Sequence, residues 1–106
     1  MKKNDPPGHL SREAKQIWRK LTSEYDICDG GGLAILRAAT EAFDRAEGAR
    51  AKIEAEGMVI KDRFGAEKPH PLLTAERDAR AAMLTALKML NLDVEPLRNG
   101  PGRPPG

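Results

Sequence analysis

The chain has 106 residues, of which 40% are hydrophobic and 32% charged, and its formal net charge is +2. These totals predict one small soluble domain whose hydrophobic core is thin, of a size that often completes its burial by self-association. No apolar run approaches a membrane span, the basic N-terminus lacks a signal-peptide core, and the single cysteine, Cys28, excludes an internal disulfide, so we expect a cytosolic protein.

The first predicted helix covers residues 11–25 and follows a flexible basic arm. The arm, residues 1–10, contains two lysines, two prolines and a glycine. Ser11 is a suitable N-cap for the helix, and Glu13 places a negative charge in its first turn. The apolar residues recur at helical spacing and form one stripe: Ala14, Ile17, Trp18, Leu21 and Tyr25.

Cations occupy the opposite side of this first helix, where Arg12, Lys15 and Arg19 share one face. The residues alone leave two interpretations open, a solvated helix face or a surface that contacts nucleic-acid phosphates. No aromatic residue is interleaved with these cations, so stacking on single-stranded bases is not indicated. If the surface binds DNA, we expect the contacts to come from Lys2, Lys3, Arg12, Lys15, Arg19 and Lys20.

The second predicted helix runs from Gly31 or Gly32 to Glu56, with Asp29 as its N-cap and Gly57 as its C-terminal stop. Three consecutive glycines separate it from the first helix. Its apolar face is rich in alanine, which allows a neighbouring helix to approach closely. The face consists of Ile35, Leu36, Ala39, Ala42, Phe43, Ala46, Ala49 and Ile53.

A short β-hairpin is predicted next, because residues 58–60 are strand formers and residues 62–65 have the composition of a turn. Pro69 and Pro71 are expected to stop the hairpin and start the third helix, with His70 as a helix-start residue rather than a catalytic base. The third helix has its own apolar stripe: Leu72, Ala75, Ala79, Ala82, Met83, Ala86, Leu87 and Leu90.

The predicted architecture is therefore an all-α core over residues 11–92, with three main helices and one short hairpin. Residues 93–106, rich in proline and glycine, are predicted to be disordered. Trp18 and Phe43 are expected to hold the monomer together. Leu73 and Leu84 fall outside the third stripe and suggest a second contact surface. The candidate residues for contact between subunits are Leu36, Leu73 and Leu84.

No catalytic or cofactor site is predicted. The pair Asp26 and Asp29 lacks an apolar pocket that would separate two pKa values, and capping explains it better. Cys28 and His70 have no orienting third residue, so Cys28 is interpreted as a small buried or half-buried thiol. Residues 29–33, DGGGL, follow a helix and lack a nearby lysine, unlike a phosphate-binding loop. The two histidines are not at metal-ligand spacing.

The order of motifs over residues 9–98 resembles the small terminase subunit of tailed phages, in the branch with a short helical core. The motifs are HLSREAKQIWRKL, DGGGL, AFDRAEGARAKIEAEG, the hairpin, and KPHPLLTAERDARAAMLTALKMLNL. The resemblance implies a ring-shaped homo-oligomer that binds double-stranded viral DNA at the start of packaging. It also implies recruitment and regulation of the large terminase subunit, which holds the ATPase and nuclease, in the cytoplasm of the infected bacterial host.

The chain has no separate helix-turn-helix domain, so we expect DNA to meet the basic arm and first helix, or the ring as a whole. Two alternatives remain open from the residues themselves. One is a helical DNA-binding regulator that acts as a dimer. The other is a helical adaptor that binds only protein. An enzyme is not expected, since small terminase subunits modulate the catalysis of a partner.

Overall fold

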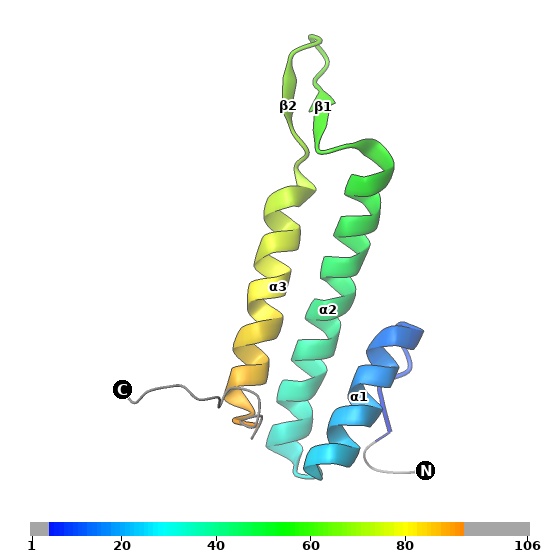
Figure 1. The fold of residues 1–106 in the computed structure, drawn as a ribbon, viewed down its shortest axis with the longest axis vertical. Coiled ribbons are helices and arrows are strands. Elements are labelled where there is room, and N and C mark those ends of the chain that lie inside the picture. The colour runs from blue at the N-terminus through cyan, green and yellow to red at the C-terminus, as the bar shows by residue number, and fades with distance from the viewer. Residues whose placement is uncertain (1–4, 93–106) are drawn as a thin grey trace, which may run out of the picture.

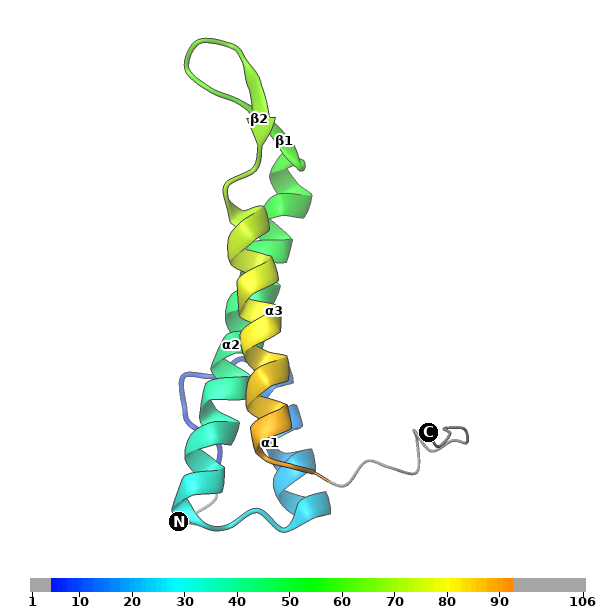
Figure 2. The same cartoon turned by 90° about the vertical axis from the view of Figure 1, so that its left-hand side faces the viewer.

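The computed structural model describes residues 5–92 and contains three helices and one two-stranded hairpin (Figure 1). Helices α2 and α3 lie side by side as an antiparallel pair, and α1 packs beside the first half of α2. The hairpin projects beyond the far end of the pair, as both views show (Figure 2). The elements are α1 (Arg12–Tyr25), α2 (Gly30–Glu56), β1 (Val59–Lys61), β2 (Glu67–Pro69) and α3 (Leu72–Met89). The predicted fold, mostly helical with a hairpin between the second and third helices, is confirmed.

Helix α1 begins at its predicted N-cap and ends at Tyr25, the last residue of the predicted range. The hydroxyl of Ser11 accepts a hydrogen bond from the amide of Ala14 at 3.0 Å, as an N-cap should. The helix stops at Asp26, which adopts a left-handed conformation with φ 51°. The amide of Ser11 also donates to the Asp44 carboxylate at 2.8 Å, which ties the start of α1 to the middle of α2. This last contact joins residues distant in sequence and was not predicted.

The hydrophobic core forms where α1 packs against the first half of α2. Trp18 and Leu36 are 4% and 0% exposed, and Phe43 packs against their cluster as a half-buried side chain. The predicted role of Trp18 and Phe43 is therefore confirmed. Leu10 is also buried, at 5% exposed, and the His9 ring lies 2.7 Å from the Glu41 carboxylate. The prediction of a flexible arm over residues 1–10 thus fails at its last two residues, because Leu10 completes the apolar cluster; residues 1–4 lie outside the described part.

Alanine lines the contact between α2 and α3, as the sequence predicts. Ala42 and Ala46 on α2 and Ala79 and Ala86 on α3 are all buried. Helix α2 begins at Gly30, slightly earlier than predicted. The first amides of a helix have no intrahelical acceptor, so glycine destabilises this turn less than it would the helix interior.

Gly32 has a more specific function at the start of α2. Its amide donates to the Asp29 carboxylate at 2.8 Å. A Cβ at Gly32 would lie 2.9 Å from an Asp29 oxygen and 3.0 Å from a carbon of Ile27, so a larger residue would displace the cap. The capping prediction for Asp29 is confirmed.

The hairpin pairs Val59 with Pro69, Ile60 with Lys68 and Lys61 with Glu67 in antiparallel register. Pro69 is thus the last residue of β2, and the hairpin stops there, as predicted. A proline is tolerated at this edge because its missing N–H removes no ladder bond that the partner needs. Pro71 directly precedes the first residue of α3.

His70 joins the end of α2, the base of the hairpin and the start of α3. It is only 4% exposed. Its Nδ1 accepts a hydrogen bond from the amide of Leu72 at 3.0 Å, so the neutral ring carries its proton on Nε2 and donates it to Glu56 at 2.7 Å. Its amide donates to the carbonyl of Met58 at 2.7 Å. The sequence predicted only a helix-start residue; the structure shows a buried polar anchor that also caps α3.

Candidate nucleic-acid interface

Most cations on α2 and α3 are engaged by carboxylates of neighbouring turns. The guanidinium of Arg50 lies 2.9 Å from Glu47 and 2.8 Å from Glu54, and Arg80 bridges Glu47 and Glu76 at 3.2 and 3.1 Å. The hydrogen bonds from Arg50 and then Arg80 hold the pKa of Glu47 below its ordinary value. The charges of these side chains are compensated within the chain, so they are poor candidates for binding an external anion.

The predicted cationic face of α1 behaves differently. Arg12, Lys15 and Arg19 have no carboxylate within ion-pair distance among residues 5–92. Arg12 and Arg19 are exposed and Lys15 is half-buried. Arg12 stands at the first position of α1, where a positive charge opposes the helix dipole, so helix stability does not explain it. The structure therefore places these three cations together as an uncompensated surface.

The other predicted contact residues divide into two groups. Lys20 lies beside Glu24, with 3.5 Å between the ammonium and the carboxylate, so its charge is partly compensated. Lys2 and Lys3 lie outside the described residues.

A second group of uncompensated cations, which the sequence reasoning missed, occupies the hairpin. Lys61, Arg63 and Lys68 are exposed and make no ion pair with any described carboxylate. Two further unpaired cations in residues 5–92, Arg45 and Lys88, stand singly. The signal in the sequence was the alternation of basic residues with Phe64 inside the predicted turn.

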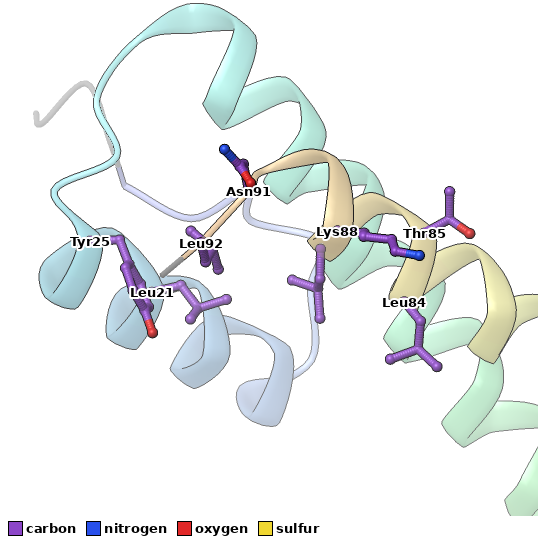
Figure 3. A pocket seen from close by; sticks show the side chains of 8 residues that line it. Leu21, Tyr25, Leu84, Thr85, Lys88, Asn91 and Leu92 are labelled. Carbon is purple, nitrogen blue, oxygen red and sulfur yellow. The ribbon is translucent and has the colours of Figure 1, made fainter. Parts of the chain in front are cut away.

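An apolar groove lies between the C-terminal parts of α1 and α3 (Figure 3). Its volume is about 590 Å³. Leu21 and Tyr25 line it from α1, and Leu84 and Leu87 line it from α3. Leu84, a predicted subunit contact, is 60% exposed here, which is a large exposed fraction for leucine.

The other two residues predicted to contact neighbouring subunits are placed differently. Leu73 is half-buried on the first turn of α3. Leu36 is fully buried in the core of the chain and offers no surface to a second copy. We therefore withdraw Leu36 from the interface, since its side chain packs against Ala14 and Trp18 of α1 rather than facing a neighbouring copy.

The described part of the chain contains no arrangement that indicates catalysis. Among residues 5–92, no three His, Cys, Asp or Glu side chains lie close enough to hold a metal ion. Asp29 is used as a helix cap. Cys28 is exposed in the loop before α2, whereas we predicted a buried or half-buried thiol. No helix in residues 5–92 combines the length and apolar character needed to cross a membrane.

These features define a small helical protein whose candidate site is a charged surface and an apolar groove rather than a catalytic pocket. Comparison with known families identifies it further. The family model described as phage terminase, small subunit, matches residues 14–95, and the chain belongs to this family. The resemblance found in the motifs is thereby confirmed. No curated protein and no solved structure matches the chain significantly.

Proposed function

We propose that this chain binds double-stranded viral DNA and recruits and regulates the large terminase subunit, so that genome packaging can start. Family membership over residues 14–95 is the observation that carries this proposal. In this role the protein is not an enzyme; it modulates the ATPase and nuclease of its partner. It acts in the cytoplasm of the infected bacterial host.

The proposed DNA contact is the face of α1 that carries Arg12, Lys15 and Arg19. Their charges are not compensated by described carboxylates, in contrast to those of Arg50 and Arg80. The spacing i, i+3, i+7 keeps the three side chains on one side of the helix, where they can follow a run of phosphates. Lys20, and the N-terminal Lys2 and Lys3, would extend the same contact.

We further propose that the protein assembles as a closed ring of identical copies. The support lies in apolar surface that one protomer leaves uncovered. Leu84 is 60% and Met89 63% exposed near the C-terminal end of α3, beside the groove lined by Leu21 and Tyr25. Exposed apolar patches of this kind mark contacts between proteins. Leu73 remains a proposed contact at the other end of α3.

The DNA contact can be tested with the triple variant Arg12→Gln, Lys15→Gln and Arg19→Gln. Binding to a labelled duplex is measured by fluorescence anisotropy across a salt series. Each lost phosphate contact lowers the log–log salt slope by about 0.9, so we expect the slope to fall by about 2 to 3. Thermal stability should be unchanged, because these side chains make no ion pair within residues 5–92.

A matched control removes the same charge elsewhere, through Arg50→Gln, Lys52→Gln and Arg77→Gln on α2 and α3. If contact is local, the control should keep a slope close to that of the wild type. Equal losses in both variants would mean that only net charge matters, which would contradict a specific surface on α1. A wild-type protein that binds no duplex at any salt concentration would favour the protein-only adaptor.

A further inference from the structure

We propose that the tip of the β-hairpin, residues 61–68, is a second contact to duplex DNA, in which Phe64 presses against the base steps of the minor groove. The inference rests on the proposed DNA binding and adds a site to it. The tip lies beyond the end of the α2–α3 pair, away from the cationic face of α1 (Figures 1 and 2).

The turn at the tip is fixed by its own hydrogen bonds. One carboxylate oxygen of Asp62 accepts from the amides of Phe64 at 2.8 Å and Ala66 at 3.0 Å. The amide of Gly65 donates to the carbonyl of Asp62 at 3.0 Å, and Gly65 adopts φ +84°, which glycine tolerates without strain. These bonds fix the backbone that carries Phe64, and one oxygen of the Asp62 carboxylate is engaged within the turn.

The side chains that the turn presents combine positive charge with an exposed aromatic ring. Phe64 is 82% exposed, more than any other large hydrophobic side chain in residues 5–92. The guanidinium of Arg63 lies 5.2 Å from the centre of the Phe64 ring. Lys61 and Lys68 flank the pair from β1 and β2, and neither is ion-paired with a described carboxylate. Glu67, opposite Lys61, is the one carboxylate at the tip that the turn does not use.

The hairpin is also held firmly at its base. His70 connects Glu56 at the end of α2 to Leu72 at the start of α3, and its amide bonds the carbonyl of Met58. Because its base is held in place, the hairpin loses little conformational entropy when it binds, and this favours binding through its tip.

Duplex DNA fits this chemistry better than a protein surface does. Three uncompensated cations match a double row of phosphates, and an apolar side chain beside them can enter between base steps in the minor groove. The α1 face offers cations without an aromatic, so it can neutralise phosphates only. The two sites would therefore contribute in different ways, one through charge alone and one through charge and base contact.

Two hairpin variants separate the two contributions. Replacing the cations, in Arg63→Gln with Lys68→Gln, should lower the salt slope of duplex binding by about 2. Replacing the ring, in Phe64→Ala, should leave the slope unchanged and weaken binding at least about fivefold, the lower end of the effect of losing a base contact. Phe64→Leu, which keeps an apolar wedge, should retain most of the affinity. A duplex that contains 2-aminopurine should brighten on binding the wild type and not on binding Phe64→Ala.

Val59→Ala serves as the matched control, because Val59 is 56% exposed at the base of the hairpin and far from the turn. Circular dichroism melting should show that all these variants fold as the wild type does. If hairpin variants bind as tightly as wild type while the α1 triple variant is weakened, the inference is overturned and the proposed function stands. If Phe64→Ala changes the mass of the particle and leaves DNA binding intact, the tip contacts protein and the inference is overturned. A wild type that binds no duplex overturns the proposed function itself.

Discussion

Leu36→Ala tests whether the hydrophobic core of the chain lies where the structure places it. Leu36 is 0% exposed and packs in the cluster with Ala14, Trp18 and Ile27. Removing a fully buried leucine side chain loses its transfer free energy and leaves a cavity, which costs about 3 to 5 kcal/mol. In a domain of this size, 1 kcal/mol corresponds to about 4–8 °C, so the melting temperature should fall by more than about 10 °C.

The assay is thermal unfolding followed by circular dichroism at two protein concentrations about a hundredfold apart. Substitution of a core residue lowers the free energy of unfolding by the same amount at both concentrations. Substitution of an interface residue lowers the free energy of unfolding at high concentration, where copies associate, and has little effect after dilution. Leu73→Ala provides the contrast, since Leu73 is half-buried and a proposed subunit contact: its loss should be smaller and should shrink on dilution. A loss below about 1 kcal/mol for Leu36→Ala, or one that disappears on dilution, would refute the placement of Leu36.

Three further predictions follow from single contacts. Leu84→Glu should shift the protein toward the monomer in sedimentation velocity, because it places a charge in the apolar groove. The control Ala38→Glu, on the exposed side of α2, should not. Identical sedimentation distributions for the two variants would contradict the groove as an interface. His70→Ala should lower the free energy of unfolding in urea by about 1–3 kcal/mol. His70→Asn should lower it by less, because the asparagine oxygen can accept the hydrogen bond that Nδ1 accepts from the amide of Leu72. Equal effects of the two variants would argue against a stabilising role for this bond. The pKa values of Glu41, Glu47 and Glu56 lie below the ordinary 4.5, owing first to hydrogen bonds from Arg37, Arg50 and His70 respectively. The ionised carboxylates therefore stabilise the folded chain above pH 4.5, and this stabilisation is lost as the pH falls through the lowered pKa values. A melting temperature that rises on acidification from about pH 5 to about pH 3 would contradict this sign.

Local patterns in the sequence were sufficient to predict the helices and the hairpin. Ser11, Asp29 and Gly57 act within a few residues of their own position, so their capping roles follow from sequence neighbours. The alanine face of α2 likewise follows from periodicity alone. The start of α2 shifted only because its first turn tolerates glycine.

Contacts between distant residues account for most of what the sequence did not predict. Leu10 joins the buried cluster formed by residues of α1 and α2. The amide of Ser11 donates to the Asp44 carboxylate where the same two helices meet. His70 depends on Glu56 from the end of another helix. An apolar stripe cannot by itself tell a residue that faces another helix from one that faces another copy, and Leu36 was misplaced for this reason.

The candidate site was predicted in part, for a related physical reason. The helical spacing of Arg12, Lys15 and Arg19 gives a common face, whereas the lack of carboxylate partners becomes visible only when the helices are assembled. The hairpin cations were missed because a turn was interpreted as a connection, although Phe64 and Arg63 stand at its exposed tip.

Sedimentation velocity of the wild-type protein mixed with a fluorescently labelled duplex tests the central claim most directly. The account predicts that the protein alone sediments as a particle of many copies and that the labelled duplex moves with it at low salt. A folded single copy that leaves the duplex sedimenting alone would contradict both the assembly and the DNA contact.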